Sequence, residues 1–465
     1  MINFIVMQAV KKYIGILIIL LIFPISWFIG KNFITDGDAA IYSYIPQESD
    51  IVIEINSRNF IGEMMYQRIF NQDYVKERVE VEKEDIPTGI NYFSKVILFR
   101  EVWANESVWI CVVGVENEQD FEKFVATKIS EPHIVTNDGY AVIQLGPSSN
   151  QEQLDEHLAN IANKKIKPFS TRVDLSKHFN KEKEINVYMI PQTSNANNQL
   201  IDGYLNMDFH QDHIDIGGEF NVVSGFNDKK GIVYPVNEEA ALSIRSSLNV
   251  FNSIWWFNSE QIENVPQYDQ LALDYDGMKI FLCDKNWGYQ FPFKSFPEMQ
   301  MRFDLSKSER WFAFFDTINA QGKIKVDTTT KSLITEQGTF LQYDITESHF
   351  DLSRSGVNLT ADPQEDVYFD MQFKIAPLLD NTKFSVDEEN PPSILEQSIG
   401  ISIAEDMIDE LHAFDNIEQI RFQMSNGGEG KIKAEGKVQM KDKNGQSMVE
   451  SMFFMTEALL YIKEF

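Results

Sequence analysis

Hydrophobic and polar positions alternate along much of the chain, as in strands that bury one face. The first example lies in residues 45–56, where isoleucine occupies positions 51, 53 and 55. Short polar links join neighbouring stretches of this kind. We therefore expect antiparallel pairs, because parallel strands need crossovers of about a dozen or more residues. The further stretches are 96–103, 107–115, 133–145 with a turn at Asn137–Gly139, 185–191, 200–209, 213–222, 271–282 with a hairpin turn at Asp276-Gly277, 340–345 and 367–375.

Apolar residues at spacings of three and four predict helices between these strands. One helix follows Ser57, one begins near Asn117, and one begins at Ser149-x-x-Glu152, which matches a capping box. Others are predicted over 240–251, 395–411 and 452–460. Together these elements predict an α+β fold with largely antiparallel sheets and packed helices.

One hydrophobic run differs from the rest. Residues 13–30, YIGILIILLIFPISWFIG, carry no charged side chain and are flanked by Lys11, Lys12 and Lys31. At about 1.5 Å per residue the run forms roughly 27 Å of helix, close to the hydrocarbon thickness of a bilayer. It predicts a single transmembrane helix that stays attached as a signal-anchor. A cleaved signal peptide is the alternative, but its apolar core is usually about 7 to 15 residues and ends at a small-residue site.

The charge distribution predicts the orientation. Lys11 and Lys12 are the only charged residues before the run, which favours a cytoplasmic N-terminus. All 70 Asp and Glu follow the run, and they outnumber the 41 Lys and Arg of the whole chain. We expect a single-pass membrane protein with its bulk extracytoplasmic. Because such an acidic surface repels phosphate backbones, nucleic acid is excluded as a partner.

These features divide the chain into five parts. A polar stretch just before residue 231 separates the two large ones, which are of similar size. The parts are a cytoplasmic stub at 1–12, the transmembrane anchor at 13–30, a tether at 31–44, and two extracytoplasmic α+β domains at 45–230 and 231–465.

The chain contains no familiar catalytic or cofactor motif: no G-x-S-x-G, P-loop, G-x-G-x-x-G, H-E-x-x-H or C-x-x-C. We therefore assign no catalytic residue, no cofactor and no metal. The best metal candidates are the imidazoles and carboxylates where two predicted strands meet at a turn, and turn chemistry explains the same residues. The two histidines need not share a face. The candidates are Asp208, His210, Asp212, His213 and Asp215.

The two cysteines, Cys111 and Cys283, lie in apolar, strand-like runs. A lone cysteine in such a run is most often a small buried hydrophobe. A disulfide between them is a second possibility. A chain of this length can bury a sizeable core without one.

Aromatic residues are concentrated between positions 251 and 315. This density is typical of binding surfaces and of cores alike, so ordinary core packing is the alternative interpretation. In residues 291–297, FPFKSFP, two prolines oppose regular strand pairing, and we expect an exposed loop. The candidate binding surface comprises Trp255, Trp256, Trp287, Phe291, Phe293 and Phe296.

The order of the first elements resembles a family of uncharacterised bacterial extracytoplasmic proteins that are anchored by an N-terminal membrane helix. The resemblance runs from IPQESDIVIEIN at residues 45–56, through a helix and a hairpin, to VGVENEQDFEKFVATKI at 113–129. It implies a bacterial cell-envelope location, with the anchor in the inner membrane and the bulk in the periplasm, and no particular reaction.

The leading hypothesis is a membrane-tethered binding or scaffold protein of the bacterial cell envelope, without catalysis. It would contact the membrane through residues 13–30, and other envelope proteins or an apolar ligand through an extended sheet surface or an aromatic groove. The alternative is a hydrolase-like envelope enzyme with scattered Asp, Glu and His. An enzyme requires a deep pocket with perturbed titratable groups, whereas a binding module requires an open groove or an exposed apolar patch.

Overall fold

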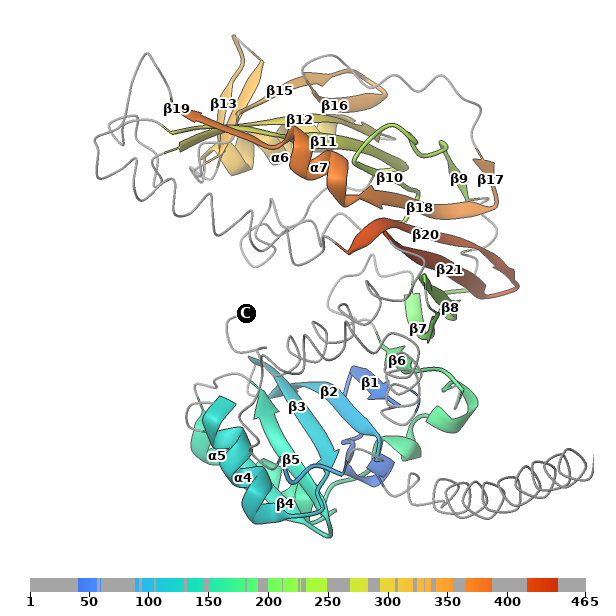
Figure 1. Cartoon of the computed structure of the whole chain (residues 1–465). Helices are drawn as coiled ribbons and strands as arrows, with labels where there is room; N and C mark the ends of the chain where they lie inside the picture. The colour runs from blue at the N-terminus through green and yellow to red at the C-terminus, as the bar shows by residue number, and fades with distance from the viewer. Residues whose placement is uncertain are drawn as a thin grey trace, which may run out of the picture. The chain divides into compact units, whose positions relative to one another are not determined.

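The computed structural model describes most of residues 41–441 (Figure 1). Within that range it leaves out 57–58, 60–87, 92–93, 104–105, 129–131, 146–149, 180–181, 191–199, 211, 225, 227–230, 249–267, 283–292, 306–307, 321–323, 330, 336–339, 354–363 and 387–415.

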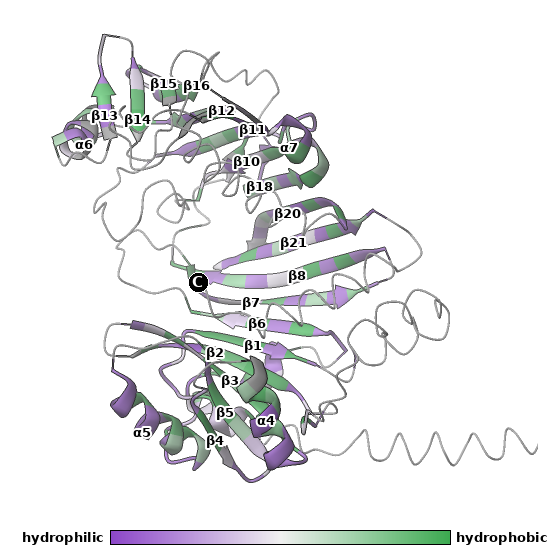
Figure 2. Cartoon of the chain, turned by 60° about the vertical axis from the view of Figure 1, so that its left-hand side comes forward, coloured by the Kyte–Doolittle hydropathy of each residue, from purple (hydrophilic) through white to green (hydrophobic). Residues whose placement is uncertain are grey.

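Antiparallel β-sheet makes up most of the described part, and hydropathy alternates along many of its strands (Figure 2). The α-helices in this part are four: α4 (Glu118–Lys128), α5 (Gln151–Ala162), α6 (Ser308–Ala320) and α7 (Ile375–Asn381). The predicted α+β fold is therefore wrong, and the fold class is corrected to mostly antiparallel β.

The helix expected over residues 240–251 shows why that prediction failed. Residues Leu242–Ser246 form strand β10, which pairs with a strand on each side. Apolar residues at positions 240, 244 and 248 fit a helical spacing, but the same segment alternates Leu242 and Ile244 with Ser243 and Arg245. The segment forms a strand because it pairs with another strand on each of its two edges. The helices expected after Ser57, over 395–411 and over 452–460 lie outside the described residues.

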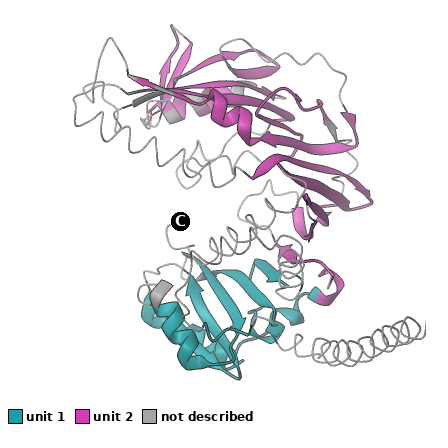
Figure 3. Ribbon diagram, in the orientation of Figure 1, with its two compact units in different colours: residues 1–61, 85–175, 465 teal, residues 62–84, 176–464 magenta. Residues whose placement is uncertain are grey.

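The chain divides into two compact units (Figure 3). Unit 1 comprises residues 1–61, 85–175 and 465, and unit 2 comprises residues 62–84 and 176–464. The boundary expected before residue 231 falls inside unit 2.

No helix of the described residues is long and apolar enough to cross a bilayer. The segment expected to span, 13–30, lies outside the described part, as does the stub at 1–12. The prediction of a single-pass inner-membrane protein with a periplasmic bulk therefore has no support in the described structure, and we withdraw it. Of the expected tether at 31–44, the last four residues form a 3-10 turn in which Ile41 and Tyr44 are buried.

Unit 1 is an antiparallel sheet with two helices. Its helix α4 begins after Asn117, as expected, and the Asn117 side-chain oxygen accepts from the backbone N–H of Gln119 at 3.1 Å. Helix α5 buries Leu154, Leu158 and Ile161, which confirms its expected apolar stripe, but Asn150 is its N-cap and the expected capping box is wrong. The strands, in order of pairing, are β4 (Ile134–Asn137), β5 (Tyr140–Leu145), β3 (Glu106–Gly114), β2 (Val96–Trp103) and β1 (Ile51–Ile55).

Unit 2 is a longer series of antiparallel neighbours. In order of pairing, its strands are β6 (Ile185–Met189), β7 (Leu200–Phe209), β8 (His213–Val222), β21 (Lys431–Met440), β20 (Ile417–Gly428), β18 (Val367–Lys374), β10, β11 (Gln270–Leu282), β12 (Phe293–Asp304), β16 (His349–Ser353), β15 (Phe340–Ile345), β14 (Ser332–Thr335) and β13 (Ile324–Asp327). Strand β19 (Lys383–Val386) is parallel to the end of β11, and the short β9 (Ile232–Val233) and β17 (Gln364–Glu365) pair with each other.

Asp276-Gly277 was expected to form a hairpin turn, but both residues lie inside strand β11, which continues past them. Its register with β12 shifts between Tyr275 and Gly277, which marks a β-bulge. Gly277 has a φ of 141°, a conformation that glycine adopts without strain. Glycine favours tight turns, but at position 277 it accommodates a bulge.

The register in unit 2 separates a polar face from an apolar face. One polar row crosses the sheet through cross-strand partners, and neighbouring charges in it pair: the Arg302 guanidinium donates to both Asp351 carboxylate oxygens at 2.8 and 3.0 Å. The row consists of Asp351, Arg302, Ala272, Arg245, Asp370 and Gln423. A second row on the same face runs from Ser243 through Gln372, Arg421 and Lys437 to Asp215 of β8 and Asp208 of β7, where the candidate site lies.

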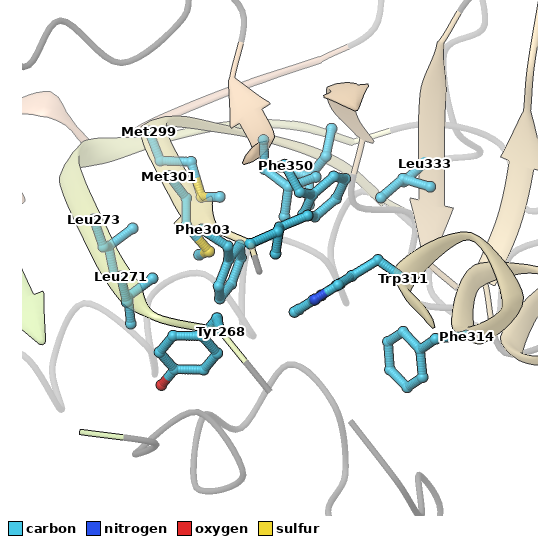
Figure 4. Packing of buried hydrophobic residues seen from close by; sticks show 13 residues of the cluster. Tyr268, Leu271, Leu273, Met299, Met301, Phe303, Trp311, Phe314, Leu333 and Phe350 are labelled. Atoms are coloured by element: carbon cyan, nitrogen blue, oxygen red, sulfur yellow. The ribbon is translucent and has the colours of Figure 1, made fainter. Parts of the chain in front are cut away.

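The opposite face near β11 and β12 packs against α6 (Figure 4). Trp311 of α6 is 2 % exposed and points at Phe303 and Phe350, with ring centroids 5.0 and 5.6 Å away. Such aromatic contacts contribute beyond the area they bury. The next residue, Phe312, is 51 % exposed.

These neighbours form a matched pair of substitutions. We expect Trp311→Ala to lower the free energy of unfolding of unit 2 by about 3–5 kcal/mol, because it leaves a cavity among aromatic rings. Phe312→Ala should change it by no more than about 0.5 kcal/mol, as a surface substitution. Urea unfolding followed by circular dichroism measures both values. Equal effects of the two variants would contradict the packing described.

Candidate metal site

The candidate site lies at the β7–β8 hairpin of unit 2. The strands have the bounds expected from the sequence, Leu200–Phe209 and His213–Val222. Asp208 pairs with Asp215 across the hairpin, and the backbone N–H of His210 donates to the carbonyl of His213 at 2.8 Å. Backbone groups therefore close the turn, and the side chains of the turn are not needed for that purpose.

Three side chains converge here. The rings of His210 and His213 stack, with centroids 4.5 Å apart and planes 28° apart. Asp215 Oδ2 lies 3.4 Å from Nε2 of His210 and 3.5 Å from Nε2 of His213. One ligand atom from each of the three residues lies within 4.8 Å of the others.

These separations suit a tetrahedral metal ion. Metal–nitrogen and metal–oxygen bonds of about 2.0–2.2 Å place the ligand atoms of a tetrahedral zinc site roughly 3.3–3.5 Å apart. Both distances from Asp215 Oδ2 fall in that range. Imidazole and carboxylate together suit zinc and the neighbouring transition metals, whereas calcium and magnesium prefer oxygen ligands alone.

Asp212 orients one of the two histidines. Its Oδ1 lies 2.6 Å from His213 Nδ1, and this hydrogen bond from the imidazole lowers the pKa of the Asp212 carboxyl. With Nδ1 engaged by a carboxylate, Nε2 is the nitrogen left to bind a metal. Carboxylate–histidine–metal arrangements of this kind fix the tautomer and ring orientation of the ligand.

The base of the hairpin is held by a buried carboxylate. Glu184 is 7 % exposed, and its Oε2 accepts from the backbone N–H of Phe209 at 2.9 Å. Burial raises the pKa of the Glu184 carboxyl, with a smaller contribution from the charge of Asp208. This contact ties the end of β7, and therefore Asp208 and His210, to the segment before β6.

The site is open to solvent. The side chains of His210, His213 and Asp215 are 41 %, 21 % and 54 % exposed. An ion can therefore reach the ligand atoms without rearrangement of the strands. The sequence interpretation named these residues but explained them by turn chemistry. It did not use the alternation of side chains along β8, which places His213 and Asp215 on one face of the strand. It also did not predict that the turn brings His210 to the same face.

The structure describes little of the aromatic surface expected from the sequence. Phe293 belongs to β12, and Phe296 of the same strand is half-buried and meets Phe281 edge-on with centroids 5.6 Å apart. The loop expected over residues 291–297 is therefore partly strand, and Pro297 pairs in register with Met278. The described pairing of β12 with β16 covers Gln300–Asp304, so Pro297 lies in a part of β12 whose only described neighbour is β11. Trp255, Trp256, Trp287 and Phe291 lie outside the described residues, and the binding surface stays a prediction.

Two buried ion pairs occur elsewhere. In unit 1, Lys95 Nζ lies 2.8 Å from Glu54 Oε2, with side-chain exposures of 6 % and 0 %. In unit 2, the Arg245 guanidinium donates to both carboxylate oxygens of Asp274 at 2.8 and 3.0 Å. Each charge has its partner within the fold, so we read both pairs as structural.

Comparisons with known proteins assign this chain to no group. No family model matches it, and no curated protein matches it. Two solved structures are similar, both of TP0453 at 9% identity: crystal form IV has a TM-score of 0.23 and covers 38% of this chain and 79% of that one. Crystal form III has a TM-score of 0.24 and covers 50% and 91%. Similarity at this level supports no inference about fold or function.

Cys111 is a free thiol on β3. It packs on an apolar cluster of unit 1 that includes Val113 and Ile143. Burial raises the pKa of the Cys111 thiol to about 12. Cys283 lies outside the described residues.

Because the thiolate is the reactive form, this shift predicts an inert cysteine. In a Cys283→Ser variant, we expect iodoacetamide at pH 8 to modify Cys111 far more slowly in the folded protein than in urea. Mass spectrometry over time measures both rates, and the denatured sample serves as the control. Equal rates in the two samples would contradict the burial of the thiol.

Proposed function

We propose that this chain is a binding protein that holds a divalent transition-metal ion at the β7–β8 hairpin. The observation that supports it is the distance from Asp215 Oδ2 to the Nε2 atoms of His210 and His213, 3.4 and 3.5 Å. Two imidazoles and a carboxylate form the ligand set of many zinc sites. Zinc itself, or cobalt or nickel, is the class of ion that this set would select.

Each residue has a distinct part in this proposal. His210 and His213 supply imidazole nitrogens, and Asp215 supplies a carboxylate oxygen. Asp212 holds His213 in the tautomer that leaves Nε2 unprotonated. The stacking of the two rings places their Nε2 atoms on the same side of the hairpin as Asp215.

The surroundings favour binding over catalysis. Three protein ligands leave a coordination position open, which is also the pattern of catalytic zinc sites. A catalytic metal, however, acts in a dry, shaped cavity. Here the ligands stand at an exposed turn, with Asp215 more than half accessible at 54 %. The proposal is accordingly a metal-dependent binding function, which we favour over the hydrolase-like alternative because the ligands are exposed.

Titration with Zn²⁺, and with Co²⁺ as a spectroscopic probe, tests the proposal. We expect Asp212→Asn to weaken binding roughly 10- to 100-fold, which is the usual cost of losing an outer-shell partner. His210→Ala and His213→Ala should each weaken it by more than that, because they remove a ligand. Calorimetry gives the affinities, and the visible absorption of tetrahedral Co²⁺ reports the geometry.

His133→Ala is the matched control, since His133 Nδ1 lies 2.9 Å from Asp155 Oδ1 at the surface of unit 1. It should leave the affinity unchanged. Binding by the full chain that is no tighter than binding by the His210→Ala, His213→Ala double variant would overturn the proposal. Thermal unfolding of each variant without metal checks that the fold is retained.

A further inference from the structure

A second carboxylate faces one of the proposed ligands, His210. It lies outside the group of three residues whose ligand atoms are all within 4.8 Å of one another, so it joins the site only by turning toward the ion. Asp208 Oδ2 lies 3.4 Å from His210 Nε2, the same distance that separates Asp215 Oδ2 from that nitrogen. Asp208 and Asp215 are cross-strand partners, so their side chains leave the same face of the hairpin. The spacing again matches an edge of a tetrahedral site, roughly 3.3–3.5 Å.

The same oxygen of Asp208 has another partner. Lys183 Nζ pairs with Asp208 Oδ2, the atom that faces His210. Lys183 precedes β6, and its side chain is 30 % exposed. A lysine ammonium on a flexible four-carbon stem can move aside at little cost.

We infer that Asp208 is the fourth ligand of the metal ion and that Lys183 competes with the ion for its carboxylate, thereby setting the affinity of the site. The inference rests on the proposed function, because it adds a ligand and a competitor to the same site. It specifies a His₂Asp₂ set, in which two carboxylates balance the charge of a divalent ion.

The competition follows from charge. An oxygen that donates its electrons to a metal ion accepts less well from an ammonium group, and the ammonium and the dication repel each other at short range. Binding of the ion should therefore displace Lys183 from Asp208. Since the ion gains Asp208 only by breaking this pair, the lysine lowers the affinity of the site without touching the metal.

A double-mutant cycle tests the inference. We expect Lys183→Met to tighten Zn²⁺ binding roughly three- to tenfold, because the ion no longer has to break the Lys183–Asp208 pair to reach the carboxylate. Asp208→Asn should weaken binding and reduce the intensity of the tetrahedral Co²⁺ absorption. In the Asp208→Asn background, Lys183→Met should have no further effect, because the two residues act through one carboxylate.

Lys431→Met is the matched control. Lys431 pairs with a different carboxylate on β8, with its Nζ 2.6 Å from Glu219 Oε1, and its loss should leave Zn²⁺ affinity unchanged. Lys183→Gln repeats the test with a polar side chain in case the methionine variant unfolds at a lower temperature.

The outcomes separate the two ideas. If the full chain binds neither Zn²⁺ nor Co²⁺, the proposed function itself fails. If it binds both ions through His210 and His213 but is insensitive to Asp208→Asn and Lys183→Met, the proposed function stands and this inference is overturned. If Lys183→Met tightens binding equally with and without Asp208, the effect is one of general charge, and the competition is likewise overturned.

Discussion

The register of the β7–β8 hairpin is the constraint on which the candidate site depends. Phe209 and Ile214 are cross-strand partners, and both are buried at 5 % and 7 % exposure. Because side chains alternate across a strand, burying this pair places Asp208 and Asp215 together on the other face. A slip of one residue would send the two carboxylates to opposite faces and expose one residue of the apolar pair. The hydrophobic effect on one side of the sheet thus fixes the geometry of the ligands on the other.

The same logic extends through unit 2, where charges inside the sheet are fixed by their neighbours. Arg245 is 2 % exposed and donates to both carboxylate oxygens of Asp274 and to the backbone carbonyl of Pro235. A buried ion pair adds little net stability, because the loss of hydration offsets the attraction, but breaking it is costly. We therefore read the pair as specifying which strands are neighbours and in which register. Another polar row of the same face ends at Asp215 of β8 and Asp208 of β7, where both carboxylates are partly exposed to solvent and Asp208 pairs with Lys183.

The local sequence pattern predicted the exact bounds of strands β7 and β8. It failed where pairing with distant segments determines the secondary structure. Strand β10 was expected to be helical because its apolar spacing fits both structures, and only pairing with β11 and β18 distinguishes them. Helix α6 was not predicted, because its aromatic residues were counted in the aromatic-rich region between 251 and 315 and their helical spacing was not used. At the site, the proposed ligands and Asp212 were named from the sequence, whereas Lys183 and Glu184 were not, because they precede another strand. His210 lies beyond the end of β7, where the alternation of a strand no longer predicts the direction of a side chain. The stacking of His210 on His213 is a property of the turn, which sequence alternation does not encode.

The net charge of −29 shows why geometry has to supply selectivity at this site. An acidic surface raises the local concentration of every divalent cation alike, so the long-range field cannot distinguish calcium or magnesium from zinc. Carboxylates alone would therefore take up the commoner hard cations. Two imidazoles change the preference, because nitrogen ligands at tetrahedral spacing suit the transition metals and fit the larger coordination shells of calcium poorly. A lysine beside one carboxylate further disfavours weakly held ions. On this view His210 and His213 choose the ion, and Asp208 with Lys183 sets how tightly it is held.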